Sequence, residues 1–214
     1  MFQIRNLLVK NILKIDQLIL SANIITIEGQ SGSGKSTLLR LLNNLDDPTS
    51  GTIFFKEKPL TSFTPQQLRK KVVMVPQNPV IFEGSIRDNL LIGLTLSTEK
   101  LVEDDRLEQM LKLFWLDKNL NENASDVSGG EKQRIALARV LMIENAEVFL
   151  LDEPTSELDD RTRDHVMKNF IKIARQQNQK IIMVTHDHHI TEMFAEDVIQ
   201  IDSFSKNSLN KVEN

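Results

Sequence analysis

The stretch GQSGSGKST, residues 29–37, constrains the fold more than any other feature of this chain. It lies between an apolar run, IITIE, and an amphipathic run, LLRLL. It fits the pattern G-x-x-x-x-G-K-[ST] at two glycines, a lysine and a hydroxyl residue: Gly29, Gly34, Lys35 and Ser36. Glycines at these places let backbone N–H groups curl around an anion, and a helix that follows adds partial positive charge. We therefore expect a strand, a phosphate-binding loop and a helix in that order.

In such a loop the lysine reaches the β- and γ-phosphates of a nucleotide, and the hydroxyl residue ligates Mg²⁺. The alternative is an ordinary glycine-rich turn between a strand and a helix, but a buried turn has no use for a lysine at its centre. The candidate nucleotide-binding residues are Gly29, Gln30, Ser31, Gly32, Ser33, Gly34, Lys35, Ser36 and Thr37.

Polar side chains also follow three other expected strands. Asp152 and Glu153 end the apolar run VFLLD, where ligands bind in open α/β sheets. Asp152 is expected to hold the Mg²⁺ shell, and Glu153 to polarise an attacking water as general base. Taken alone, such a pair is also common in an acidic loop or at a helix start. Gln77 and His186 follow two further strands, and both could face the γ-phosphate and the water.

Short β-rich runs alternate with helical ones, which predicts an α/β fold with a mainly parallel sheet. The turn DDPTSG ahead of TIFF indicates an antiparallel β edge among the early strands. Between residues 83 and 126 the strand signal vanishes, and apolar residues recur at helical spacing: Leu101, Leu107, Leu111 and Phe114. We expect an inserted helical subdomain there. The expected strands are FQIRNLLV, QLILS, IITIEG, TIFF, VVMVP, EVFLLD, KIIMVTH and VIQID.

Two groups of apolar residues, one inside this region and one just before it, allow more than one interpretation. Met110 and Trp115 are expected in the core of the helical subdomain, and not in a ligand stack. The run Val80, Ile81 and Phe82 could be an exposed apolar surface for a partner or part of the same core.

The stretch DVSGGEKQRIALARVLM, residues 126–142, predicts a second anion site, because Ser128, Gly129 and Gly130 precede a strongly helical run. The first residue after the glycines is Glu131, whose carboxylate suits an empty helix N-terminus but could repel an arriving phosphate. A P-loop kinase would have no use for this second site, so the stretch argues against phosphate transfer to a small acceptor.

Five segments in this order resemble the nucleotide-binding subunit of ATP-binding cassette (ABC) transporters over residues 1 to about 202: GQSGSGKST, PQNP, VSGGEKQR, VFLLDEPTSELD and VTHD. The resemblance implies a RecA-like P-loop NTPase fold, ATP and Mg²⁺ as ligands, and ATP hydrolysis. By position it implies that Gln77 senses Mg²⁺ and touches a membrane partner, that Ser128, Gly129 and Gly130 form the signature loop, and that Asp159 and His186 are the D-loop and switch residues.

The resemblance further implies one nucleotide-binding domain over residues 1–214. Residues 1–82 and 127–204 would form its catalytic core, 83–126 the helical subdomain, and 205–214 a flexible tail. It implies a homodimer in the ATP-bound state, in which the signature loop of one subunit closes on the ATP held by the other.

The resemblance is exporter-like around VVMVPQNPVIFEGSIRDNLLIG, and a narrower one points to stand-alone ATPases of the Fet type, linked to iron or metal export. An ABC ATPase that regulates or assembles another complex without transport is the alternative. The chain has no tyrosine, and no clear aromatic precedes the phosphate loop where the family stacks adenine, which leaves base recognition and the hydrolysis of other nucleotides open.

Charge and hydropathy limit the partners that we expect. A net charge of -4 gives no basic footprint for nucleic acid, and the absence of cysteine excludes disulfides and thiolate metal sites. No run approaches the roughly 18 apolar residues that would span a bilayer. We therefore expect a cytoplasmic protein that is peripheral at the membrane through an integral membrane transporter subunit.

Overall fold

The computed structural model describes residues 1–97, 100 and 102–204. The chain divides into two units, each made of separate stretches of sequence. The first holds Met1–Met74, Val148–Asp152 and the chain from Lys180 onward, and the second holds Val75–Glu147 and Glu153–Gln179. Leu101 and the predicted tail at 205–214 lie outside the described residues.

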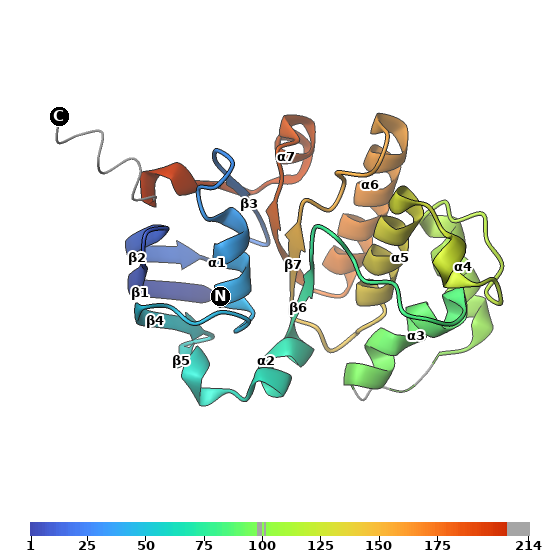
Figure 1. Ribbon diagram of the computed structural model, residues 1–214, viewed down its shortest axis with the longest axis horizontal. Coiled ribbons are helices and arrows are strands. Elements are labelled where there is room, and N and C mark those ends of the chain that lie inside the picture. Colours follow the sequence, from blue (N-terminus) through green and yellow to red (C-terminus); the bar gives the residue numbers. More distant parts are fainter. Residues whose placement is uncertain (98–99, 101, 205–214) are drawn as a thin grey trace. The chain divides into compact units, whose positions relative to one another are not determined.

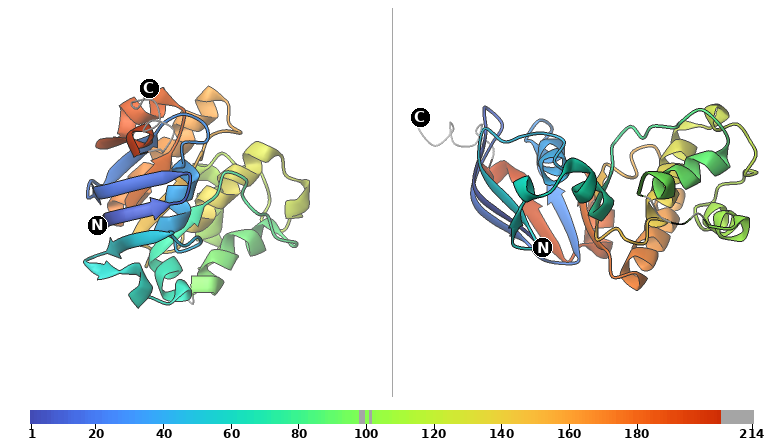
Figure 2. Two further views of the ribbon diagram at one scale, coloured as in Figure 1. Left: turned by 60° about the vertical axis from the view of Figure 1, so that its left-hand side comes forward. Right: turned by 90° about the horizontal axis from the view of Figure 1, so that it is seen from below.

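An antiparallel sheet of order β2-β1-β4-β5 forms one layer of the first unit. Its strands are β1 (Phe2–Val9), β2 (Leu13–Leu20), β4 (Ser50–Phe55) and β5 (Lys58–Pro59), and its edge-on view is clearest in Figure 2. The predicted antiparallel β edge is confirmed. Strand β2 begins four residues before the predicted run QLILS, because Leu13 and Ile15 are buried while Lys14 and Asp16 are exposed, the alternation of a half-buried strand.

The second sheet has the order β6-β7-β8-β3-β9, and its pairs β7·β8, β8·β3 and β3·β9 are parallel. Its strands are β6 (Val72–Val75), β7 (Val148–Asp152), β8 (Lys180–Val184), β3 (Ile24–Glu28) and β9 (Asp197–Gln200). Strand β7 is buried along its whole length, as expected for a parallel strand covered on both faces. The α/β prediction is confirmed.

Helix α1 (Lys35–Leu42) packs its apolar face into the core that both sheets share (Figure 1). Its leucines Leu38, Leu39, Leu41 and Leu42 are buried against residues of β1, β4 and β7. The helix that follows the phosphate loop is therefore fixed by apolar contacts on several sides. The remaining helical elements of this unit are η1 (Leu60–Ser62), α2 (Pro65–Lys71), α7 (His188–Phe194) and η3 (Ile201–Phe204).

The second unit is helical, with α5 (Gly129–Leu141) in contact with α3 (Ile86–Ser97), α4 (Asp104–Leu113) and α6 (Asp160–Gln176). A short turn, η2 (Ala124–Asp126), precedes α5. The unit includes α5 and α6, which the sequence-based boundaries placed in the catalytic core. A grouping by compactness does not test a functional boundary, so the predicted division at residues 83–126 stays a prediction.

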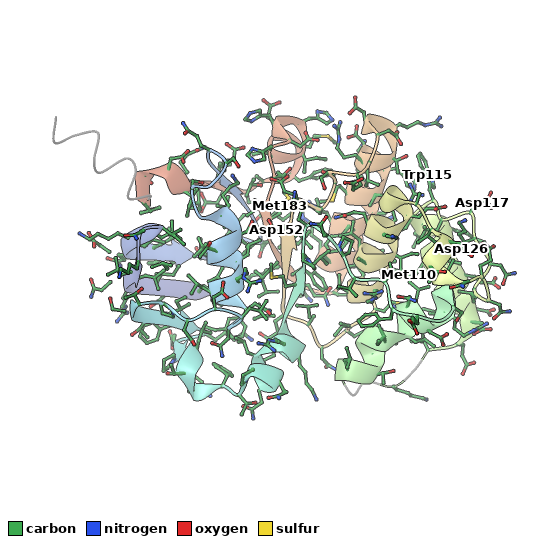
Figure 3. All side chains as sticks on the ribbon, in the orientation of Figure 1. Met110, Trp115, Asp117, Asp126, Asp152 and Met183 are labelled. Atoms are coloured by element: carbon green, nitrogen blue, oxygen red, sulfur yellow. The ribbon has the colours of Figure 1, made fainter. Side chains whose placement is uncertain are left out.

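The expectation that Trp115 lies in the helical core is wrong. Met110 is buried at 5% exposure, but Trp115 is 40% exposed and lies beyond the end of α4, with a φ of 51° (Figure 3). Because the chain leaves the helix at Phe114, the helical spacing no longer directs Trp115 inward. Its ring instead stacks on His165 of α6, with centroids 3.7 Å apart.

Candidate functional site

The loop between β3 and α1 needs glycine at its end. Gly34 has a φ of 100°, and a Cβ there would approach the side chain of Leu13 to 2.9 Å. Any other residue would therefore be both strained and crowded at this position. Gly32 has a φ of 79° with open space around it. At this position glycine is therefore favoured by the backbone conformation and not by crowding.

The side chain of Lys35 is enclosed by this loop and hydrogen-bonds to its backbone. The side chain is 7% exposed, and its Nζ donates to the carbonyl oxygens of Gly29 at 2.8 Å and of Gln30 at 2.9 Å. The loop is therefore folded around an ammonium group, the cation that the sequence motif assigns to phosphate binding. The hydroxyl of Ser33, 6% exposed, has no hydrogen-bond partner among the described residues. A buried hydroxyl without a partner fits a loop that receives a polar ligand.

Ser36 and Asp152 are 116 positions apart in sequence and meet in the first unit. The Ser36 hydroxyl donates to Oδ1 of Asp152 at 3.0 Å. Asp152 closes strand β7 and pairs with Val184 at the carboxyl end of β8; Figure 3 labels it beside Met183. A hydroxyl and a carboxylate are oxygen ligands of the type that Mg²⁺ prefers, so the pair fits this metal.

Burial raises the pKa of the Asp152 carboxyl, while the hydrogen bond from Ser36 and the charge of Lys35 act against the rise. A raised pKa means that the unfolded chain loses this proton first as the pH rises. The ionised Asp152 carboxylate therefore lowers the free energy of unfolding as the pH rises above the ordinary pKa of aspartate. The loss of stability is complete once the pH exceeds the raised pKa of the folded state. Below the ordinary value the cost is absent.

Asp152→Asn is expected to raise the melting temperature of the protein at pH 7 in EDTA without nucleotide, because it removes a charge that burial penalises. The gain should shrink as the pH is lowered toward about 4, where aspartate is neutral in the unfolded chain as well. Asp16→Asn, at an exposed position of β2, is the matched control and should show neither effect. A lower melting temperature for Asp152→Asn at pH 7 would show that the Ser36 contact outweighs the burial cost.

The signature residues form a capping box at the start of α5. The Ser128 hydroxyl accepts from the backbone N–H of Glu131 at 3.3 Å, and the Glu131 carboxylate accepts from the backbone N–H of Ser128 at 2.7 Å. Lys118 lies 3.5 Å from the other carboxylate oxygen. Burial acts to raise the pKa of Glu131, but the hydrogen bonds with Ser128 and the charge of Lys118 prevail and lower it. The Glu131 side chain thus bends back over Ser128, and the ammonium group of Lys118 balances its negative charge.

The two glycines of this stretch let α5 begin close to the segment after β7. A Cβ on Gly130 would lie 2.9 Å from the backbone oxygen of Glu157, and one on Gly129 would lie 3.0 Å from that residue's carboxylate. Glycine is therefore required at 130 because backbone atoms cannot give way. The same segment ends at Asp159, whose carboxylate accepts from the N–H of Thr162 at 3.0 Å and caps α6.

Glu153 lies in a strained backbone conformation that the sequence did not predict. Its φ is 47°, in the left-handed region that a residue other than glycine, asparagine or aspartate seldom adopts. Its carbonyl oxygen accepts from Nε2 of Gln133, a fully buried side chain of α5, at 3.4 Å. Strain of this kind costs of order 1–3 kcal/mol and is concentrated at functional sites. Gln133 carries no motif that would have marked it as a neighbour of Glu153.

The other predicted site residues end strands as expected from the sequence. Gln77 follows β6 and is exposed, and His186 follows β8 and is exposed. Lys35, Ser36, Asp152 and His186 belong to the first unit, whereas Gln77, Ser128, Glu153 and Asp159 belong to the second. The convergence of all of these residues on one nucleotide stays a prediction, as do their individual roles.

A loop of the phosphate-binding pattern after a parallel strand, with a partly buried hydroxyl–carboxylate pair beside it, defines an α/β protein of the P-loop NTPase class. A family model described as ABC transporter matches residues 14–156, more than half of the chain. The chain therefore belongs to the ABC transporter family.

Known relatives support this assignment. A lactococcin transport/processing ATP-binding protein of Lactococcus lactis is 42% identical over 178 residues, which are 79% of this chain and 24% of that protein. A methionine import ATP-binding protein of Staphylococcus haemolyticus is 33% identical over 202 residues, 91% of this chain and 59% of that protein. An ATP-binding cassette solved as a dimer after hydrolysis, bound to ADP and Pi, has a TM-score of 0.79 and 25% identity, with 94% and 95% of the two chains covered.

The chain spans about a quarter of the lactococcin protein and less than two thirds of the methionine protein. The similarity extends to a protein named for import and to one named for transport and processing of a bacteriocin. The exporter-like character and the narrower Fet-type resemblance therefore stay predictions.

Proposed function

We propose that this chain is an ATPase that drives a separate transmembrane subunit by ATP-dependent dimer closure. The observation that carries the proposal is the arrangement in the first unit, where the loop folds around Lys35 and Ser36 meets Asp152 at 3.0 Å. This combination offers a cation and backbone N–H groups to a polyphosphate, and oxygen ligands to the Mg²⁺ that would accompany it.

In the proposed reaction, a water attacks the γ-phosphorus of ATP in line with the bond to the β-phosphate oxygen. A P–O bond forms to the water, the bond to ADP breaks, and Glu153 takes the proton of the water as general base. Lys35 and His186 bind the phosphate oxygens and stabilise the charge that develops on them. The left-handed φ of 47° at Glu153 ends the extended course of β7 at the residue that would act as the base.

Ser36, Asp152 and Gln77 would hold Mg²⁺, which would neutralise part of the phosphate charge. The chain's own contribution is to keep Asp152 buried at 6% exposure and in contact with Ser36, so that two oxygen ligands are already adjacent.

In this proposal the second anion site binds the ATP that is held by the phosphate loop of a second copy of this chain. Ser128, Gly129 and Gly130 give each chain a helix N-terminus that its own phosphate loop does not require. ATP held between two chains stabilises the closed dimer by binding both, and hydrolysis removes the bridging phosphate. Asp159, at the start of α6, would contact the same interface.

Ser128→Ala tests the composite site against a matched variant in the same chain. Thr64 forms an equivalent capping box with Gln67 on α2, and neither residue is among the proposed nucleotide contacts. Both Ser128→Ala and Thr64→Ala should cost about 1 kcal/mol of stability through the lost cap. Only Ser128→Ala should also weaken ATP-dependent dimerisation, measured by sedimentation. Equal dimer affinity in the two variants would contradict the composite site.

The partner proposed for the dimer is an integral membrane subunit. Among the described residues, no helix combines the length and apolar character needed to cross a bilayer. Val80 is 60% exposed and Phe82 is 40% exposed, while Ile81 between them is partly buried. We propose that this exposed pair, named here the Val80–Phe82 pair, offers an apolar contact to a helix of the membrane subunit.

A further inference from the structure

Arg139 of α5 is a partly buried cation held by neutral oxygen atoms. Its Nε donates to the carbonyl oxygen of Asn89 at 2.6 Å, its Nη2 to Oδ1 of Asn89 at 2.9 Å, and its Nη1 to the carbonyl oxygen of Val80 at 3.0 Å. Burial lowers the pKa of Arg139 to about 10. Among the described residues no carboxylate pairs with it. Its three hydrogen bonds therefore fix the position of the segments that it contacts, and do not neutralise its charge.

Asn89 extends this contact to Phe82. The Asn89 side chain is fully buried; its Oδ1 accepts from the N–H of Phe82 at 2.9 Å. Its Nδ2 donates to the carbonyl oxygens of Phe82 at 2.8 Å and of Ser85 at 3.1 Å. One amide thus satisfies both backbone groups of Phe82, as a neighbouring strand would. The backbone of Phe82 is therefore held by a side chain, whereas Gly84 and Ser85, further along the same segment, contact the backbone of residues 123–124.

Both residues of the Val80–Phe82 pair contact this network, Val80 through its backbone oxygen and Phe82 through its backbone and its ring. The Arg139 guanidinium lies over the Phe82 ring, 5.3 Å from its centroid. Helix α3 approaches α5 closely at this level, because a Cβ on Gly93 would be 3.3 Å from both Cγ and the backbone oxygen of Arg139. In the view of Figure 1 the segment between β6 and α3 passes across α5, and the hydrogen bond from Arg139 to Val80 joins the two elements.

We propose that Arg139 is a positioning residue: its guanidinium, directly and through Asn89, attaches the exposed Val80–Phe82 pair to helix α5, so that the pair moves with the helix that Ser128 caps. Helix α5 runs from Gly129 to Leu141, so one rigid element carries the signature residues at its start and the attachment near its end. The inference rests on the proposed function only in taking the pair as the surface for the membrane subunit.

The attachment can be measured without nucleotide or partner. The chain has no cysteine, so Val80→Cys accepts a single nitroxide label while the backbone oxygen that binds Arg139 is kept. Arg139→Lys keeps the positive charge but cannot make the three-way fork of hydrogen bonds. We expect the label at position 80 to become more mobile in Arg139→Lys, seen as narrower electron paramagnetic resonance lines. Asn89→Leu, which removes the amide donors and acceptor and adds no charge, should loosen the label as well.

Two controls separate positioning from a loss of stability. A label at Ile19→Cys, exposed on β2, should be unaffected by Arg139→Lys. Arg106→Lys, at an exposed arginine that pairs with Glu144, should leave the label at position 80 unchanged. An equally immobile label at position 80 in both Arg139→Lys and Asn89→Leu would overturn the inference. So would a parallel change at positions 19 and 80, because that would report general loosening.

A second arm tests movement with α5. In the Glu153→Gln chain, ATP should shift the spectrum of the label at position 80 when Arg139 is present, and the shift should be lost in Arg139→Lys. Light scattering on the same samples reports the dimer. A dimer without any shift in the Arg139 chain would overturn the inference and leave the proposed function intact. No dimer at all would count against the proposed function, and the nucleotide-free mobility measurement would then decide the attachment.

Discussion

Glu153→Gln is expected to lower kcat for ATP hydrolysis by about 10²–10⁴-fold, the usual contribution of a general base. Glutamine has the same size and can still orient a water, but it cannot take the proton. The affinity for ATP should change little, because Glu153 lies after β7 and makes none of the contacts that fold the loop around Lys35. The measurement is steady-state phosphate release together with equilibrium nucleotide binding.

Glu108→Gln on the exposed side of α4 is the matched control, since it makes the same chemical change in the same unit. It should hydrolyse ATP at the rate of the unmodified chain. Near-normal hydrolysis by Glu153→Gln would show that another group takes the proton, and the strained backbone at Glu153 would then need a different explanation.

Lys35→Ala should have the largest effect on ATP binding. Truncating one partner of a buried, hydrogen-bonded charge pair costs about 2–5 kcal/mol, which corresponds to a rise in Kd of about 30-fold to about 5,000-fold. The structure gives the reason, since the Lys35 ammonium is buried at the centre of the loop and would face the phosphates. Isothermal titration with a non-hydrolysable ATP analogue measures this directly.

Part of that loss could come from the loop itself, because Lys35 also binds the carbonyl oxygens of Gly29 and Gln30. Lys35→Met keeps the apolar stem and removes only the ammonium, so it should lose nearly as much affinity as Lys35→Ala. Lys14→Ala on exposed β2 should bind as the unmodified chain does. Binding by Lys35→Met at the unmodified affinity would contradict the assigned contact.

The sequence predicts the fold well where short-range signals suffice. The glycine pattern of residues 29–37 predicts the loop between β3 and α1, and apolar runs predict most of the parallel strands. The 3.0 Å approach of Ser36 and Asp152 follows from the rule that ligands bind at the carboxyl ends of parallel strands. Position along a strand is thus enough to bring together residues 116 apart in sequence.

Other features depend on tertiary contacts that a single sequence does not contain. The exposure of Trp115 depends on where α4 ends and on His165, which belongs to a distant helix. The network around Arg139 links three separate segments through one guanidinium and one amide, and neither residue type is diagnostic. The backbone conformation of Glu153 has no sequence signal either, because nothing about glutamate favours a positive φ.

The mass of the Glu153→Gln chain in solution tests the central claim most directly. Hydrolysis is blocked in this variant, so ATP bound between two chains should hold them together. At micromolar concentration with ATP and Mg²⁺, multi-angle light scattering should give twice the 24.5 kDa of one chain, and the mass should return to that of one chain when nucleotide is removed. A mass of one chain in a sample shown to carry bound ATP would contradict the account.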